Sequence, residues 1–285
     1  MKVISLVNHK GGVGKTTITF NLAVNLTKLG YKVLVIDFDS QGNLSKTVGI
    51  EQKYDIENKS YKIGTALEEI MRDLETKLEL DKYIHTSSKY SDLDIIPCDL
   101  SFAETKLRLN AATERCFVLN ILINQIKEER DYDFILIDNA PSIDVDFQNS
   151  LVASDYALIV TEADDYSVDG IIRLITQLGK IKKFYNPNLQ IAGIVINKAN
   201  MRTKLAKAMT NQISKIFGDV HINVYNSVIP QSVKIGESKM MEKSIGEYDS
   251  KNPVTKALES FTEEFVKSVM KRGAKWHLRL KTERH

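Results

Sequence analysis

Cysteine, proline and long apolar runs are scarce in this chain of 285 residues. The two cysteines, Cys98 and Cys116, do not have the spacing of a metal site, so we interpret both as core thiols of a protein in a reducing compartment. No run of about 18 apolar residues occurs, which argues against a membrane-spanning helix. The first residues enter an apolar segment at once, so we expect no signal peptide and a cytoplasmic location.

A net charge of one sign is also lacking, because 39 Lys and Arg residues balance 37 Asp and Glu residues. No overall field therefore favours a polyanionic partner, and any nucleic-acid binding must come from a local patch. Apolar residues make up 43% of the chain, which is enough for one large α/β core. The length permits one or two domains, and we favour one.

What the chain does have is a glycine-rich loop directly after its first apolar run. Residues 8–17 read Asn-His-Lys-Gly-Gly-Val-Gly-Lys-Thr-Thr. Gly11, Gly12 and Gly14 allow backbone N–H groups to approach a polyphosphate, and Lys15 can neutralise its β- and γ-phosphates. Thr16 offers a hydroxyl to Mg²⁺, and the apolar pattern that follows predicts a helix over 15–29 whose N-terminus faces the same anion.

The loop departs from the general GxxxxGK(S/T) pattern because His9 stands at its first glycine and Lys10 adds a second lysine. The form KGGxGK(S/T) resembles the deviant Walker A motif of the ParA/MinD family of P-loop ATPases. This resemblance implies ATP and Mg²⁺ as cofactors. By that match the ATP-binding residues of the loop are Lys10, Gly11, Gly12, Val13, Gly14, Lys15, Thr16 and Thr17.

Two further apolar runs end in carboxylates. The run 33–36 is followed by Asp37 and Asp39 in a stretch that resembles the family's A′ motif, with Ser40 where proline is usual. The run 134–137 ends at Asp138 and resembles its Walker B motif. The resemblance implies that Asp39 positions the attacking water, and that Thr16, Asp37 and Asp138 serve the metal. Paired Asp residues at a strand end can instead be turn formers.

Two later segments fit recognition of the base. Asn197 ends a predicted strand, where its amide could bind adenine, and Pro230 and Gln231 follow another, where the family packs a loop on the base. Asn at the end of a strand is also commonly a turn former, and that alternative stays open.

Short apolar runs alternate with helical patterns along the chain. Strands are predicted at 32–37, 93–97, 134–138, 156–161, 191–197 and 227–230, and helices at 101–109, 113–129, 168–184, 201–217 and 253–271. This order predicts an α/β fold with a doubly wound, mostly parallel sheet. We expect a single P-loop ATPase domain over 1–272, with a surface insertion at about 51–91 and a basic tail at 273–285.

Lys10 is the second cation of the loop. In the family that the chain resembles, this lysine reaches the phosphates of a partner subunit. Carried over, this implies a homodimer that encloses two nucleotides, slow hydrolysis that ends the dimer, and Lys10, Lys15 and Asp39 as catalytic residues. A solvated loop cation is the simpler alternative for Lys10.

Members of the family bind DNA without sequence preference, dock on membranes or drive redox chemistry. Arg202, Lys204, Lys207 and Lys234 could form a phosphate-binding stripe, although basic residues on an exposed helix are often simply solvated. Trp276, Leu278 and Leu280 make only a thin apolar face, so membrane docking of the MinD type is the alternative that we favour less. Neither cysteine stands in the setting of an iron–sulfur reductase.

These observations together predict a DNA partition ATPase of the ParA/Soj type. It would dimerise on ATP, bind nonspecific DNA on the nucleoid, and release it when a ParB-type centromere-binding adaptor stimulates hydrolysis. Because the chain starts at the P-loop, we expect no operator-specific helix-turn-helix domain.

Overall fold

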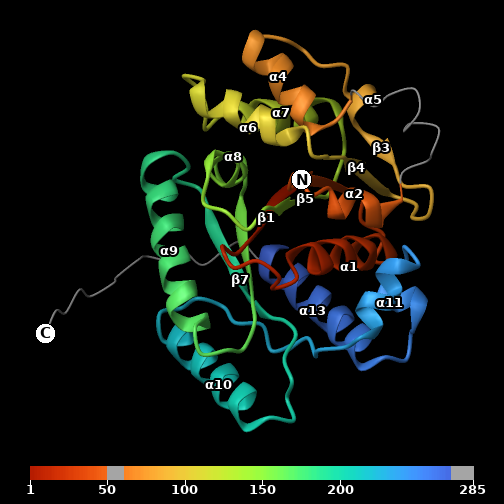
Figure 1. Cartoon of the computed structure of the whole chain (residues 1–285), viewed down its shortest axis with the longest axis vertical. Coiled ribbons are helices and arrows are strands. Elements are labelled where there is room, and N and C mark those ends of the chain that lie inside the picture. Colours follow the sequence, from red (N-terminus) through yellow and green to blue (C-terminus); the bar gives the residue numbers. More distant parts are fainter. Residues whose placement is uncertain (50–60, 271–285) are drawn as a thin grey trace, which may run out of the picture.

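The structure is a computed structural model that describes residues 1–49 and 61–270. Seven strands form one sheet in the order β3-β4-β2-β5-β1-β6-β7 (Figure 1). The strands are β1 (Lys2–Val7), β2 (Val33–Phe38), β3 (His85–Thr86), β4 (Leu93–Ile96), β5 (Phe134–Asn139), β6 (Tyr156–Thr161) and β7 (Gln190–Ile196). Every neighbouring pair is parallel except β3 with β4 at the edge. The prediction of a doubly wound, mostly parallel sheet is confirmed.

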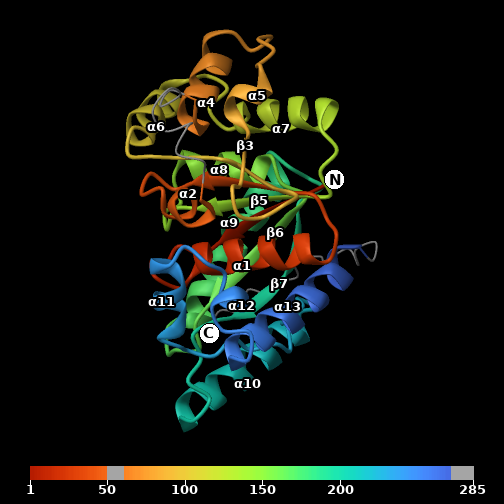
Figure 2. The ribbon, with the colours of Figure 1, turned by 90° about the vertical axis from the view of Figure 1, so that its right-hand side faces the viewer.

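Helices cover both faces of this sheet. Their bounds are α1 (Lys15–Lys28), α2 (Asn43–Val48), α4 (Ile63–Arg72), α5 (Leu80–Tyr83), α6 (Phe102–Ala111), α7 (Val118–Glu129), α8 (Val145–Val152), α9 (Ser167–Phe184), α10 (Lys204–Asp219), α11 (Lys234–Met240), α12 (Ile245–Tyr248) and α13 (Pro253–Met270). Figure 2 shows α4, α6 and α7 above the sheet and α1, α11 and α13 below it.

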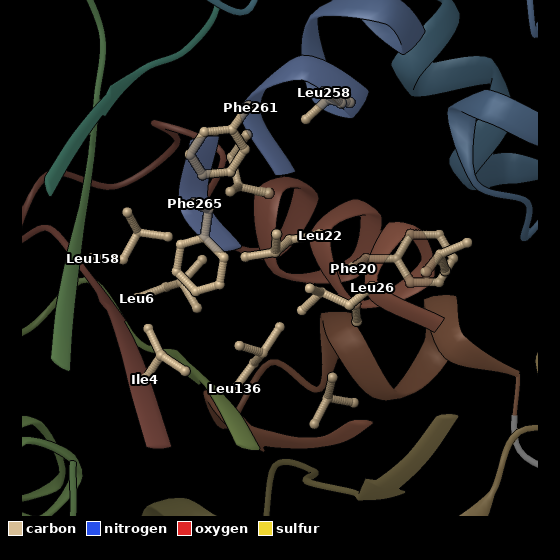
Figure 3. Packing of buried hydrophobic residues seen from close by; sticks show 14 of the residues in the cluster. Ile4, Leu6, Phe20, Leu22, Leu26, Leu136, Leu158, Leu258, Phe261 and Phe265 are labelled. Atoms are coloured by element: carbon tan, nitrogen blue, oxygen red, sulfur yellow. The ribbon is translucent and has the colours of Figure 1, made fainter. Parts of the chain in front are cut away.

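Successive residues of the central strands pack into different layers. Ile4 and Leu6 of β1 belong to the cluster between the sheet and helices α1 and α13, whereas Val3 belongs to the cluster between the sheet and helices α4 and α7. Phe261 and Phe265 of α13 point toward the sheet, where Phe265 lies near Leu6 and Leu158, as Figure 3 shows. Strands that are covered on both faces must be apolar throughout, which explains the near-continuous apolar runs of the sequence.

The segment expected as a surface insertion is described from residue 61 onward, and there it is part of the core. Ile63, Leu67 and Ile70 of α4 are fully buried in one cluster with Ile36 of β2. The short strand β3 extends the sheet at its edge. The amphipathic helix was recognised in the sequence, but its apolar face covers the sheet because β2, β4 and β5 leave that face otherwise exposed.

Several elements differ from the sequence prediction, and for two of them the local reason is clear. The strand predicted at 227–230 is wrong, because this segment makes only an isolated bridge between Ala199 and Pro230, and proline has no N–H to donate to a ladder. Helix α10 begins at Lys204 rather than 201, since the Thr203 side chain caps it by accepting a hydrogen bond from the Ala206 N–H at 3.2 Å.

None of the helices within residues 1–49 and 61–270 combines the length and the apolar character needed to cross a bilayer. The basic tail, including Trp276, Leu278 and Leu280, lies outside the described residues.

Candidate functional site

A cavity of about 640 Å³ lies at the carboxyl ends of the central strands. This is the edge at which open α/β sheets bind ligands. Residues from five stretches of the chain line it: Gly12, Gly14, Lys15, Thr16, Thr17; Asp39, Asn43; Asn139; Asn197, Lys198; and Gln231, Ser232, Val233, Ile235, Gly236, Lys239. The sheet thus brings together residues more than half the chain apart.

The glycine-rich loop adopts a conformation that requires glycine at two positions. Gly12 has φ +78° and Gly14 has φ +92°, both in the left-handed region. A Cβ on Gly14 would also clash with the Nδ2 atom of Asn197. Gly14 is the N-cap of α1, so the first free N–H groups of that helix adjoin the cavity.

Lys15 is the buried lysine of the loop, with 7% of its surface exposed. Its Nζ donates to the carbonyl of Asn8 at 3.0 Å. Burial lowers the pKa of this amine, whereas the charges of Asp138 and Asp39 raise it. An anion in the cavity would compensate the same buried charge.

Asp37 and Asp138 are register partners on the adjacent strands β2 and β5. Oδ2 of Asp37 accepts hydrogen bonds from the backbone N–H of Ser45 at 2.8 Å and from its hydroxyl at 2.7 Å. Burial, and then the Asp138 charge, raise the pKa of Asp37 to about 7. The two carboxyls therefore lie side by side at the ends of two adjacent strands.

Asp138 is 1% exposed and only partly satisfied. Its Oδ1 accepts from the Thr19 hydroxyl at 3.2 Å, but its Oδ2 is buried without a hydrogen-bond partner among the described residues. Burial raises the pKa of this carboxyl to about 6, although the hydrogen bond from Thr16 and the charge of Lys15 lower it. A buried, unpaired carboxylate oxygen beside a threonine hydroxyl suits a hard divalent cation such as Mg²⁺.

Asp39 follows β2 and lines the cavity, where its Oδ1 accepts from the Gln41 N–H at 3.1 Å. Asn139 lines it as well, although we did not single it out in the sequence. Its Nδ2 donates to the carbonyl of Leu6 at 3.0 Å, and its buried Oδ1 has no partner in the described part of the chain. Its place directly after Asp138 was the signal that could have identified it.

Two of the three residues expected at the base line the cavity. Nδ2 of Asn197 donates to the carbonyl of Val13 at 2.8 Å, and its Oδ1 is buried without a partner within residues 1–49 and 61–270. Gln231 lines the cavity, while Pro230 lies beside it in sequence and is not among the lining residues. Asn197 therefore supports the glycine-rich loop in addition to facing the cavity.

Lys10 does not line the cavity in this structure. Its Nζ pairs with Asp164 and, at 3.4 Å, with Glu162. The hydrogen bond to Asp164 raises the pKa of Lys10. Glu162 also pairs with Lys198 at 3.4 Å, so the two acids hold lysines on either side of the loop.

Three of the four basic residues expected at DNA lie together on the surface, whereas Lys234 stands between two residues that line the cavity. Arg202, Lys204 and Lys207 are exposed at the start of α10, and none of them makes an ion pair with another described residue. Lys234 instead pairs with Glu237 at 2.8 Å. Figures 1 and 2 place α10 at the lower end of the molecule.

Similarity to known proteins identifies the family of this chain. A family model described as an AAA domain matches residues 1–191. The sporulation initiation inhibitor protein Soj of Bacillus subtilis is 32% identical over 251 residues, which cover 88% of this chain and 92% of Soj.

Two solved structures share the fold. McdA of Cyanothece in complex with ATP has a TM-score of 0.78 at 19% identity, covering 97% of this chain and 98% of that one. The plasmid partition protein of Borrelia burgdorferi bound to AMPPNP has a TM-score of 0.74 at 24% identity, covering 93% and 98%. With its glycine-rich loop and its two strand-end carboxylates, the chain belongs to the ParA/Soj family of P-loop ATPases.

Proposed function

We propose that the protein is a DNA partition ATPase that works in the cytoplasm on the nucleoid. ATP with Mg²⁺ drives its dimerisation, the dimer binds DNA without reading its sequence, and a ParB-type adaptor stimulates the hydrolysis that releases it. Arg202, Lys204 and Lys207 carry the DNA part of this proposal, because they are exposed cations with no acidic partner among the described residues.

Phosphates and metal would occupy the end of the cavity near Lys15 and Asp138. Gly11, Gly12, Val13, Gly14, Thr16 and Thr17 complete the loop around the phosphates. Oδ2 of Asp138 and the hydroxyl of Thr16 would hold Mg²⁺, with Asp37 in support, because Ser45 already occupies its Oδ2. The metal supplies charge neutralisation on the transferred phosphoryl group.

Hydrolysis would depend on positioning and charge. Lys15 neutralises the β- and γ-phosphates, and Asp39, which lines the cavity, orients the attacking water. For the base, the unpaired Oδ1 of Asn197 can accept a hydrogen bond from the adenine amino group, with Pro230 and Gln231 beside it.

Dimerisation would recruit Lys10 to the phosphates of the partner subunit. In the described chain Lys10 is held by Glu162 and Asp164, so it must leave these carboxylates to act in trans. We propose residues 1–272 as the ATPase domain and 273–285 as a basic tail.

The binding of DNA can be tested with the triple variant Arg202→Ala, Lys204→Ala, Lys207→Ala. We expect wild type with ATP to shift random duplex DNA, with an affinity that falls steeply as salt rises, because phosphate contacts release counterions. The triple variant should bind more weakly, and its log affinity against log salt should have a slope shallower by about 2 to 3. Lys256→Ala removes an exposed lysine of α13 and serves as the matched control.

Cosedimentation with anionic liposomes, with and without ATP, is the companion measurement. An ATP-loaded protein that pellets with liposomes and ignores DNA at low salt would contradict the partition proposal and support a MinD-like spatial regulator instead. Wild-type DNA affinity in the triple variant would place the DNA contacts elsewhere.

A further inference from the structure

Lys239 is a lysine of the cavity that the functions above do not use. It lies near the end of α11 and is partly buried, whereas the next residue, Met240, is 85% exposed. Lys239 lines the same cavity as Lys15 and Asp39. The side chain thus turns inward from a surface helix.

Three other lysines around the glycine-rich loop have partners in the structure. Nζ of Lys15 donates to the carbonyl of Asn8, Nζ of Lys198 donates to that of Gly12, and Lys10 pairs with two carboxylates. Nζ of Lys239, in contrast, makes no hydrogen bond and no ion pair with any residue in 1–49 or 61–270. A partly buried cation without a partner is costly unless an anion joins it.

Two charged groups, Asp138 and Lys198, influence the pKa of Lys239. Burial lowers the pKa of Lys239, the charge of Asp138 raises it, and the charge of Lys198 lowers it further. Asp138 is the carboxylate with the unpaired Oδ2 beside Thr19. The cavity lining groups Lys239 with Lys15, Thr16 and Asp39, and the influence of the Asp138 charge agrees with a place near the phosphates and the metal.

We infer that Lys239 binds the terminal phosphates of a nucleoside triphosphate, as a cation that α11 supplies from within the same subunit. This inference rests on the proposed placement of the phosphates next to Lys15 and Asp138. It adds Lys239 to Lys15 and Lys198 as a third lysine of the cavity and makes α11 part of the nucleotide site. Since the added contact is to the terminal phosphates, Lys239 would favour the triphosphate over the diphosphate.

Fluorescent mant-ATP and mant-ADP, titrated in Mg²⁺ and in EDTA, test the inference on the full chain. Lys239→Met removes the charge and keeps an unbranched side chain, and Lys239→Gln is a second uncharged variant should the first fold poorly. We expect mant-ATP affinity to fall about tenfold and mant-ADP affinity less than about threefold, as expected for one lost charged hydrogen bond. Lys239→Arg should stay within about threefold of wild type.

Lys243→Met removes an exposed lysine four positions along the chain and should leave both affinities unchanged. Equal mant-ATP affinities of wild type and Lys239→Met would overturn the inference. Tighter binding of Mg²⁺ with mant-ATP in Lys239→Met would overturn it too, because Lys239 would then occupy the place of the metal beside Asp138. Lys15→Ala, titrated alongside, tests the phosphate placement itself: if it binds mant-ATP normally, the proposed site fails, whatever Lys239 does.

Discussion

The two walls of the cavity are built by different means. The wall formed by the glycine-rich loop and the ends of β2 and β5 is buried and hydrogen-bonded, with Lys15 and Asp138 at 7% and 1% exposure. The wall formed by α11 and the residues before it is open to solvent, with Val233 79% exposed. The first wall is fixed by the sheet, so its charges are in place before a nucleotide binds.

Side-chain pairs on the surface hold the second wall in place. Glu237 of α11 accepts from Lys234 at 2.8 Å and from the hydroxyl of Tyr248 in α12 at 2.7 Å. Exposed pairs of this kind contribute little to stability. We call the first the strand-end wall and the second the α11 wall. We infer that the strand-end wall determines whether nucleotide binds at all, whereas the α11 wall determines which nucleotide binds best.

Among substitutions in the strand-end wall, Lys15→Ala should reduce nucleotide affinity most. Loss of its charge from a buried phosphate site should lower mant-ATP affinity about 100-fold or more in an equilibrium titration. Lys243→Ala is the matched control, since that lysine is exposed and does not line the cavity; it should change affinity less than about threefold. Retained binding in Lys15→Ala would show that the two walls have been assigned the wrong roles.

Asp39→Ala should separate binding from turnover. We expect ATP binding within about threefold of wild type, but phosphate release slower by about 100-fold, because the attacking water loses its positioning group. A coupled assay for released phosphate measures the second quantity, and mant-ATP titration measures the first. Normal phosphate release would refute the role given to Asp39.

Gly14→Ala should disrupt the contact between the glycine-rich loop and Asn197. The new Cβ meets the Nδ2 atom of Asn197 at a residue with φ +92°, so we expect a loss of about 2 kcal/mol in the free energy of unfolding. At Gly11 the nearest atom to a Cβ is in Pro141 at 3.9 Å, and Gly11→Ala should cost less than about 0.5 kcal/mol. Urea unfolding of the two variants compares them directly, and equal losses would contradict the strain at Gly14.

The pH dependence of stability tests the strand-end carboxyls without a substitution. Burial raises the pKa of Asp37 to about 7 and that of Asp138 to about 6, so the folded chain keeps protons that the unfolded chain has lost. The free energy of unfolding that these groups contribute therefore falls as pH rises from about 4 to about 7.

Magnesium needs the ionised carboxylates. The rise in Tm on adding ATP with Mg²⁺ should accordingly be larger at pH 8 than at pH 6 in differential scanning fluorimetry. Asp138→Asn, which cannot ionise, should reduce this difference. A larger rise at pH 6 would contradict the assignment of these carboxyls to the metal.

The sequence predicted the strand-end wall well because its signals are local. Asp37, Asp39 and Asp138 each come directly after an apolar run, and parallel strands bring such ends to one edge. It predicted the other wall poorly. Lys239 and Asn139 were not identified, and 227–230 was expected to be a strand. The sequence also gave no sign that α4, a clear amphipathic helix, covers β2 and β5 as part of the core.

The sequence by itself determined the fold class, the phosphate-binding loop and the order of the strand-end acids, because periodicity, glycine and a carboxylate after a buried strand act over a few residues. Only the tertiary structure decided that Asp37 and Asp138 are register partners, that Lys10 is held by Asp164, and that Lys239 faces the cavity. Those outcomes depend on which segments pack side by side, and packing joins residues that the sequence separates by more than two hundred positions.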